Sequence, residues 1–240
     1  YYMFGLHAVK AAIENPCRKK HELWISKNAR TKIFSDLTLP SIPIFSLDKS
    51  KNLPISENKV HQGAILKVSP LKQPSNIHEI SKKKQPKLVV VLDKVSDPQN
   101  VGAIIRTFNF FGGKNLIITK DHSSEINGSL AKSASGALEN INIIRVPNLS
   151  MALKNLRKKG FIIIGLDENS DVFLHKIKDY RNEKKVIVMG SEGKGLRRLT
   201  RENCDFLVSI ANNNDSDFNT LNVSVSSALA LYEFMGSENN

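Results

Sequence analysis

From residue 87 onward, short uninterrupted apolar runs alternate with segments in which apolar residues recur at helical spacing. The runs are LVVVLD, NLIIT, INIIRV, FIIIGLD, KVIVMG and FLVSI, and strands that are buried on both faces have this composition. The helical segments are PQNVGAIIRTFNFF, SLAKSASGAL, SMALKNLRKKG, GLRRLTREN and NVSVSSALALYEFM. Strands and helices in alternation predict an α/β fold with a mostly parallel sheet covered by helices.

Residues 1–70 show the same alternation on a smaller scale. FGLHAVKAAIEN predicts a helix, HELWIS and IPIFSL predict strands, and HQGAILKVSP closes the segment. The next stretch, LKQPSNIHEISKKKQP, has two prolines, three consecutive lysines and few large apolar residues, which indicates a linker. We therefore predict a small α/β domain over 1–70, a linker over 71–86 and a larger α/β domain over 87–240.

A turn and a helix follow the first strand of the larger domain. Asp97 suits the N-cap, Pro98 suits the first helical position, and Gly112 and Gly113 predict the helix end. One apolar stripe contains Val101, Ile104, Ile105, Phe108 and Phe111. Arg106 lies roughly 160° from the centre of that stripe. It is therefore either a solvated arginine or one that serves a site outside its own core.

Charge is distributed unevenly between the two predicted domains. The chain has 35 Lys and Arg against 23 Asp and Glu, a net charge of +12. Residues 1–86 hold 15 basic and 6 acidic residues, and residues 87–240 hold the remaining 20 and 17. A basic module beside a near-neutral one indicates capture of a polyanion next to chemistry done elsewhere. The alternative is that the excess of basic residues in 1–86 belongs to an ordinary solvated surface with no polyanion bound to it.

Several classes of protein are disfavoured. Cys17 and Cys204 lie far apart and have no second thiol or histidine at metal-ligand spacing, so we expect neither a disulfide framework nor a metal site. A reducing, cytoplasmic location fits this composition. The apolar runs are much shorter than a membrane helix requires, and no signal peptide opens the chain, so we expect no contact with a membrane.

Two further stretches carry candidate ligand-binding residues. In VIVMGSEGKGLRRL a predicted strand ends at Gly190, and the glycines that follow let backbone N–H groups approach a ligand closely. This loop is neither a Walker loop nor a dinucleotide fingerprint, and Glu192 within it is either functional or an ordinary exposed carboxylate. In TLNVSVSSALALYEF, Asn222 and Ser224 stand at a helix start, where they suit a cap.

Taken together and in order, three stretches resemble motifs of the SpoU/TrmH family of RNA ribose methyltransferases: DPQNVGAIIR, VIVMGSEGKGL, and SI followed by TLNVSVSSALALYE. FGLHAV and HQGAI resemble the ribosomal-RNA branch of that family, so the resemblance covers almost the whole chain. It implies a catalytic α/β domain with a deep trefoil knot and a small, ribosomal-protein-like RNA-binding domain before it. It also implies S-adenosylmethionine bound in the knot, and a homodimer.

The resemblance assigns candidate site residues. The catalytic positions of the family correspond to Asn100, Arg106, Glu192, Asn222 and Ser224. The positions that contact the cofactor correspond to Gly190, Ile210 and Leu221, and no metal is implied. After Ile210 the family commonly has Pro and a Gly-containing loop, whereas here Ala211 leads into the longer NNNDSDFN, and Thr220 replaces the usual Ser. Thr keeps a hydroxyl, so the departure concerns the shape of the adenosine pocket rather than the activity.

The activity that the resemblance implies is transfer of a methyl group from S-adenosylmethionine to the ribose 2′-hydroxyl of a guanosine in large-subunit rRNA. Sulfonium is a good leaving group, so the protein must mainly align the reactants and help the hydroxyl lose its proton. The resemblance places Arg106 beside the reacting ribose at a subunit interface. A guanidinium is a poor base, so we favour electrostatic activation.

Two other functions stay open. A tRNA substrate is disfavoured by the basic front domain. A non-catalytic RNA-binding protein is disfavoured because all five catalytic candidates occur together.

Overall fold

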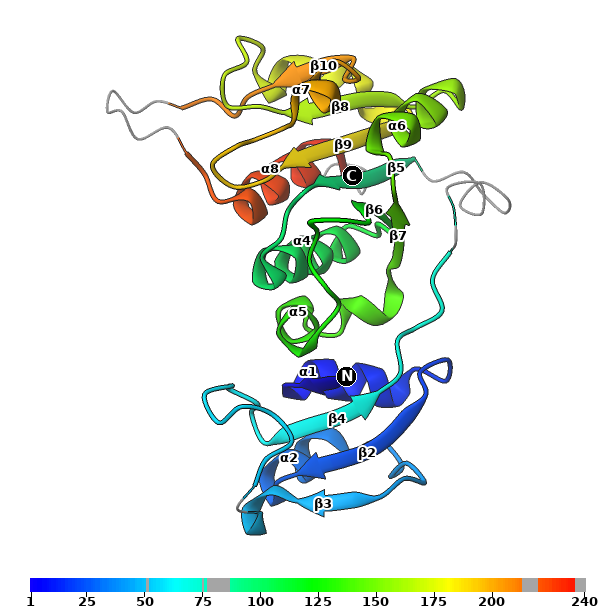
Figure 1. The fold of residues 1–240 in the computed structure, drawn as a ribbon, viewed down its shortest axis with the longest axis vertical. Coiled ribbons are helices and arrows are strands. Elements are labelled where there is room, and N and C mark those ends of the chain that lie inside the picture. Colours follow the sequence, from blue (N-terminus) through cyan, green and yellow to red (C-terminus); the bar gives the residue numbers. More distant parts are fainter. Residues whose placement is uncertain (51, 75, 77–86, 213–219, 236–240) are drawn as a thin grey trace.

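The computed structural model describes residues 1–50, 52–74, 76, 87–212 and 220–235. The molecule is elongated, with a small sheet at one end and a larger sheet at the other (Figure 1). We call the part around the small sheet the N-terminal unit and the part around the larger sheet the C-terminal unit. Residues 75 and 77–86 of the predicted linker lie outside the described residues. The domain boundaries at residues 70 and 87 and the trefoil knot stay predictions.

The N-terminal unit is a four-stranded sheet in the order β1-β4-β2-β3. Strand β4 runs antiparallel to β1 and β2, and β3 runs parallel to β2. Its elements are β1 (Tyr2–Phe4), α1 (Leu6–Glu14), β2 (Lys20–Ile25), α2 (Lys27–Ile33), β3 (Ile44–Ser46), the 3-10 turn η1 (Leu47–Lys49) and β4 (Ala64–Val68).

The predicted helix and strands of this unit are confirmed, whereas β1 and α2 were not predicted. Helix α2 has only two buried residues, Ala29 and Ile33, so its periodicity is weak. It is started instead by a cap, because the Ser26 side chain accepts a hydrogen bond from Ala29 N at 3.2 Å.

The C-terminal unit is a six-stranded sheet in the order β10-β8-β9-β5-β6-β7, and every neighbouring pair is parallel. The chain moves outward from β5 to β7 on one side and then returns to build the other side, where β9 lies between β5 and β8. The strands are β5 (Leu88–Asp93), β6 (Asn115–Thr119), β7 (Asn142–Val146), β8 (Ile162–Leu166), β9 (Lys185–Gly190) and β10 (Phe206–Val208). The predicted parallel sheet is confirmed.

Helices cover both faces of this sheet, as predicted. The helices are α4 (Pro98–Phe110), α5 (Gly128–Ala134), α6 (Leu149–Lys158), α7 (Arg198–Arg201) and α8 (Val223–Met235), with the 3-10 segments η2 (Ala137–Asn140) and η3 (Leu174–Asn182). The helix predicted around SLAKSASGAL is present but ends earlier than predicted. Helix α5 ends at Ala134 because Ser135 and Gly136 have φ values of 51° and 93°, and η2 follows.

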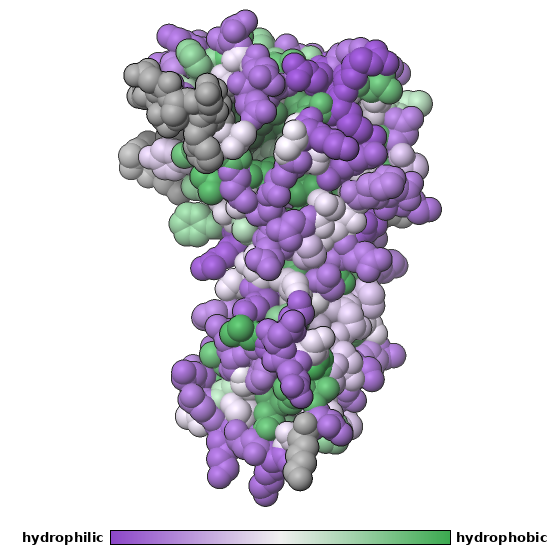
Figure 2. All heavy atoms as spheres, turned by 60° about the vertical axis from the view of Figure 1, so that its left-hand side comes forward, coloured by the Kyte–Doolittle hydropathy of each residue, from purple (hydrophilic) through white to green (hydrophobic). Residues whose placement is uncertain are grey.

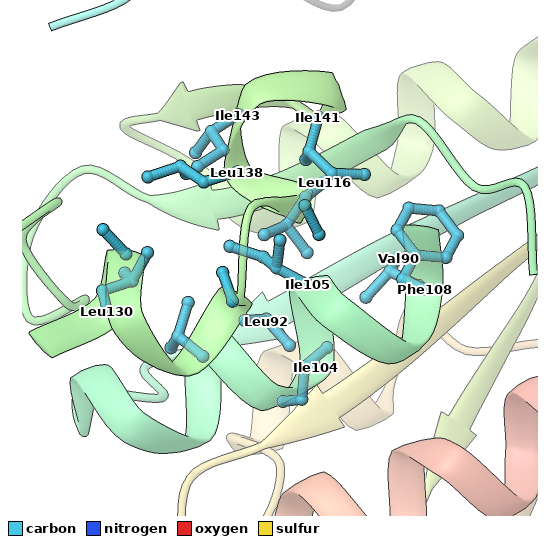
Figure 3. Packing of buried hydrophobic residues seen from close by; sticks show 14 of the residues in the cluster. Val90, Leu92, Ile104, Ile105, Phe108, Leu116, Leu130, Leu138, Ile141 and Ile143 are labelled. Atoms are coloured by element: carbon cyan, nitrogen blue, oxygen red, sulfur yellow. The ribbon is translucent and has the colours of Figure 1, made fainter. Parts of the chain in front are cut away.

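Helix α4 forms as its sequence predicts and positions the candidate site. The carboxylate of Asp97 accepts hydrogen bonds from the backbone N–H groups of Gln99 and Asn100, at 3.2 and 3.3 Å. The helix ends before Gly112, whose φ is 79°. Its apolar stripe packs against residues of β5 and β6, and the close-up in Figure 3 shows Ile105 and Phe108 beside Leu116 and Val90.

The two faces of the larger sheet bury separate sets of side chains. Alternate residues of β5 point to opposite faces, so Val90 and Leu92 join the cluster under α4, α5 and α8, while Val89 and Val91 join the cluster under α6. No described helix is long and apolar enough to span a bilayer.

Candidate active site

The candidate residues of the three motifs meet at the carboxyl ends of β5 and β9. These strands are neighbours, with Leu88 opposite Lys185 and Asp93 opposite Gly190. Asn100 lies in the first turn of α4, Glu192 lies just past β9, and Asn222 immediately precedes α8. Open parallel sheets bind ligands outside the carboxyl ends of strands, where neighbouring connections run in opposite directions. The motifs therefore converge on the edge of the sheet where a ligand is expected.

Hydrogen bonds join the three side chains into one cluster. Asn222 Nδ2 donates to Asn100 Oδ1 at 3.1 Å and to Glu192 Oε1 at 3.3 Å. Asn100 Nδ2 also donates to Glu192 Oε1. One carboxylate oxygen therefore accepts two amide donors, while Glu192 Oε2 has no hydrogen-bond partner among the described residues. The cluster lies at the surface, where a substrate can reach it.

Ser224 holds the cluster in place. Its backbone N and its Oγ both donate to Asn222 Oδ1, at 2.8 and 2.5 Å. Because both donors act on the oxygen of the Asn222 amide, its nitrogen must face Asn100 and Glu192. The interpretation of Asn222 and Ser224 as a cap is thus correct locally and incomplete, because the capping amide also joins the site.

The loop after β9 is folded back on itself. Ser191 N donates to Gly195 O at 3.1 Å, and Gly195 N donates to Ser191 O at 2.9 Å. A Cβ at Gly190 would lie 2.1 Å from the carbonyl carbon of Gly195, so Gly190 is needed for loop closure. Gly193 and Gly195 have φ values of 75° and 60° and no atom within 4 Å of the place a Cβ would take. The backbone at these two glycines therefore faces open space.

An ion pair between a buried carboxylate and a half-exposed guanidinium, which sequence reasoning missed, anchors this loop. Asp93 is 0% exposed. Its Oδ1 accepts from Arg197 Nε at 2.6 Å, and its Oδ2 accepts from Arg197 N at 3.1 Å. The only sequence signal is a carboxylate at the end of the apolar strand LVVVLD, because nothing local connects it with an arginine 104 residues later. The pair ties the end of β5 to the loop that carries Glu192.

A pocket of about 220 Å³ lies beside the cluster, lined by Lys94, Val95, Ser96, Asp97, Ser191 and Glu192. A larger pocket of about 390 Å³, lined by Pro147, Asn148, Leu149, Ser150, Arg197, Arg198, Leu199 and Thr200, contains none of the predicted site residues. The smaller pocket is the better candidate for substrate, because it shares Glu192 with the cluster.

Arg106 is not part of this cluster in its own chain. It is exposed, and no described residue forms a hydrogen bond or ion pair with it. It lies six residues after Asn100, about 9 Å further along α4 and about 120° around it. The prediction that its side chain points away from its own core is confirmed.

The cofactor candidates Ile210 and Leu221 lie on the two sides of the loop NNNDSDFN, which differs from the usual family sequence. Residues 213–219, which make up most of this loop, are outside the described residues. Ile210 is half-buried against the core, and Leu221 is 50% exposed.

Within the described ranges, no three His, Cys, Asp or Glu side chains could hold a metal ion together. Burial raises the pKa of the Cys204 thiol to about 12, so this group is a poor nucleophile at neutral pH.

Two family models together match most of the chain. Residues 87–232 match the SpoU rRNA methylase family, and residues 2–74 match the domain described as RNA 2′-O ribose methyltransferase substrate binding. The chain therefore belongs to the SpoU rRNA methylase family, a family of RNA 2′-O-methyltransferases, and the resemblance of its motifs is confirmed.

Relatives match over nearly the full length. A protein of Pseudomonas aeruginosa is 33% identical over 97% of this chain and 95% of its own length. One of Escherichia coli K12 is 32% identical over 96% of each chain. Both are named 23S rRNA (guanosine-2′-O-)-methyltransferase RlmB.

Solved structures establish the fold. The SpoU methyltransferase AviRb of Streptomyces viridochromogenes, in complex with AdoMet, has a TM-score of 0.74 at 19% identity and covers 98% of this chain and 89% of its own. An AdoMet-bound rRNA methyltransferase of Sinorhizobium meliloti has a TM-score of 0.72 at 20% identity, covering 100% and 88%.

The two ion pairs near this loop give a stability prediction. Asp93→Ala should lower the free energy of unfolding by about 2–4 kcal/mol, because the partly buried Arg197 N–H loses its acceptor while the half-exposed guanidinium can rehydrate. The matched control is Glu202→Ala, which removes the exposed i,i+4 partner of Arg198 and should cost less than about 0.5 kcal/mol. Urea unfolding measures both, and equal losses would contradict the anchoring role of Asp93.

Proposed function

We propose that this protein transfers a methyl group from S-adenosylmethionine to the ribose 2′-hydroxyl of a guanosine in 23S rRNA. The cluster of Asn100, Glu192 and Asn222 at the carboxyl ends of β5 and β9 carries the proposal. The names of the full-length relatives support the nucleotide and the RNA. The match of residues 2–74 to a substrate-binding domain favours this reading over a binding protein without activity.

The residues present fit S-adenosylmethionine. The open backbone at Gly193 and Gly195 suits close approach of a ligand, and Leu221 offers an exposed apolar side chain for an adenine ring. When bound, the cofactor supplies a methyl carbon attached to a sulfonium. Gly190 was predicted to contact the cofactor. We propose instead that it acts on the cofactor indirectly, because its lack of a side chain allows the loop to close.

The cluster and Arg106 divide the remaining work. The two amides hold the Glu192 carboxylate so that Oε2 can accept a hydrogen bond from a ribose hydroxyl, which orients the sugar. As the 2′-oxygen forms its bond to the methyl carbon, the carbon–sulfur bond of the sulfonium would break and leave a neutral thioether. The hydroxyl proton would pass to solvent, because a guanidinium is a poor base. The Arg106 guanidinium stabilises the negative charge that develops on that oxygen. For this role Arg106 must approach a cluster that it does not reach within its own chain.

A second copy of the chain provides that approach. Helix α8 buries one face in its own chain and leaves Val225, Leu229 and Tyr232, spaced by four and three residues, 47%, 42% and 66% exposed. Phe110 of α4 is 83% exposed, and Arg106 precedes it by one helical turn. Apolar patches interrupt the mostly hydrophilic exterior of the molecule in Figure 2. We propose that this α4–α8 surface forms a homodimer in which each subunit lends Arg106 to the other.

A trefoil knot around the cofactor and a cytoplasmic location stay predictions. Metal-independent chemistry is also a prediction.

The activity and the role of Arg106 can be tested together. On 23S rRNA transcribed in vitro, the wild-type protein with S-adenosylmethionine should produce a new primer-extension stop at a guanosine. Arg106→Ala should lower the methylation rate by about 100-fold or more, because an electrostatic contact to the developing charge is lost. Its affinity for S-adenosylmethionine should change by less than about twofold. Arg157→Ala on α6 is the control, and methylation confined to tRNA would contradict the proposed substrate.

Subunit mixing tests whether Arg106 acts across the interface. Arg106→Ala and Asn222→Ala should each be inactive alone. A re-equilibrated equimolar mixture should recover about a quarter of wild-type activity, because half of the dimers are mixed and each mixed dimer has one intact site. No recovery in a mixture shown to exchange subunits would mean that both residues act within one chain.

The interface itself makes a separate prediction. Leu229→Asp should convert a dimer into a folded monomer, because a carboxylate replaces an apolar contact at the centre of the α8 face. Sedimentation velocity measures the change, and methylation should fall with the dimer fraction. Met151→Asp provides the control, since Met151 of α6 is 58% exposed and lies outside this surface. A Leu229→Asp protein that stays dimeric would place the interface elsewhere.

A further inference from the structure

A buried ion pair joins the N-terminal unit to the C-terminal unit. Arg18 precedes β2 in the N-terminal unit, and Glu139 lies in η2 of the C-terminal unit. Arg18 Nη2 donates to Glu139 Oε1 at 2.6 Å, and Arg18 Nε donates to Glu139 Oε2 at 3.1 Å. The two side chains are 1% and 4% exposed. This is a bidentate pair that is removed from water, unlike the exposed pairs of the surface.

The remaining hydrogen-bonding groups of the pair are satisfied. Arg18 Nη1 donates to Ser69 O at 2.9 Å, and Asn15 Nδ2 donates to Glu139 Oε2 at 2.7 Å. Charged groups cost free energy when buried unless their geometry is matched in this way. A bidentate guanidinium–carboxylate pair also restricts orientation, because its two parallel bonds break if either group turns. The pair thus specifies how the two units sit on each other.

Close packing surrounds the ion pair. A Cβ at Gly128 would lie 2.4 Å from Cε1 of Phe4, and one at Gly136 would lie 2.9 Å from Cβ of Ala11. Helix α1 lies against α5 and η2 (Figure 1). One continuous cluster of buried apolar side chains extends through both units. The segment that follows β4 is also tied down, because Gln73 Oε1 accepts a hydrogen bond from Ile143 N of β7 at 2.7 Å.

The contact continues to the candidate active site. Helix α5, which leads into η2, packs closely on α4: a Cβ at Gly102 would lie 2.6 Å from Leu130 O. Ser133 Oγ donates to Gln99 O at 2.7 Å, one residue before Asn100. The segment formed by α5 and η2, which carries Glu139, is therefore packed against α4, the helix that carries Asn100 and Arg106.

We infer that Arg18 and Glu139 are positioning residues, which hold the N-terminal unit as a fixed arm and so set where captured rRNA meets the catalytic cluster. The inference rests on the proposed function, because it concerns delivery of that substrate. An arm released from η2 still captures RNA through its basic surface, but only a fraction of its orientations place the ribose at the cluster. The apparent KM for RNA rises by the inverse of that fraction, while turnover at saturation and cofactor affinity do not change.

Salt separates docking from RNA capture. A buried pair is screened little by dissolved ions, whereas contacts with phosphates weaken steeply as salt increases. The two units of the wild-type protein should therefore keep one arrangement in small-angle X-ray scattering from low to high salt, while affinity for RNA falls.

The test compares Glu139→Ala with the wild type and with Asp205→Ala. Glu139→Ala leaves the buried Arg18 charge without its carboxylate, so the units should separate and the radius of gyration should increase. The KM for an rRNA fragment should rise about tenfold if about a tenth of the molecules stay docked, with kcat and S-adenosylmethionine affinity within about twofold of wild type. Asp205→Ala removes an ion pair with Arg157 inside the C-terminal unit and should leave both the scattering and the KM unchanged.

Glu139→Gln is the second variant, because it keeps an oxygen acceptor for Arg18 and should fold if Glu139→Ala does not. It should show a smaller change in the same direction. Separated units with an unchanged KM would overturn the inference and leave the proposed function standing. An unchanged arrangement in both Glu139 variants would overturn it as well. A wild-type protein that methylates no rRNA would refute the proposed function, while the scattering would still test the docking.

Discussion

The pairing of β5 with β9 is the constraint on which the site depends. The two strands run parallel from Leu88 opposite Lys185 to Asp93 opposite Gly190, and both are buried by helices on each face of the sheet. Their carboxyl ends therefore emerge side by side. The first turn of α4 follows one strand, and the glycine loop follows the other, which brings Asn100 within hydrogen-bonding reach of Glu192. A shift of register would separate the amide from the carboxylate and leave each as an ordinary surface group.

A buried carboxylate forms an ion pair at two connections in the molecule, one between β5 and the glycine loop and one between the two units. Asp93 holds the glycine loop to the end of β5 through Arg197, and Glu139 holds the N-terminal unit through Arg18. In both places a carboxylate with little solvent exposure pairs with a guanidinium, and both of its oxygens accept hydrogen bonds. Such pairs add little net stability compared with apolar residues of the same size, but removing one partner is strongly destabilising. The exposed Arg198–Glu202 pair has no comparable influence on geometry.

The exposed apolar face of α8 and the isolation of Arg106 are explained by one proposed interface. A helix that is apolar on both sides is costly in water unless something covers its second face. An arginine that points away from its own core has no evident role within one chain. A second subunit placed on this surface would cover Val225, Leu229 and Tyr232, and it would bring its own Arg106 toward the neighbouring cluster. Each active site would then be complete only in the dimer, so loss of the dimer would also remove the activity.

The sequence by itself determined most of the elements, the parallel α/β class and the family. Strand burial, the Asp97–Pro98 cap and the glycine stop after α4 are local, because each depends on residues within a few positions of one another. The three motifs also identified Asn100, Glu192, Asn222 and Ser224 in advance. Only the tertiary structure decided that these side chains share one hydrogen-bonded cluster, that Gly190 serves loop closure, and that Arg106 stands apart. Partners such as Arg18 and Glu139 lie 121 residues apart, and no local pattern encodes a contact that exists only once both sheets have formed and docked.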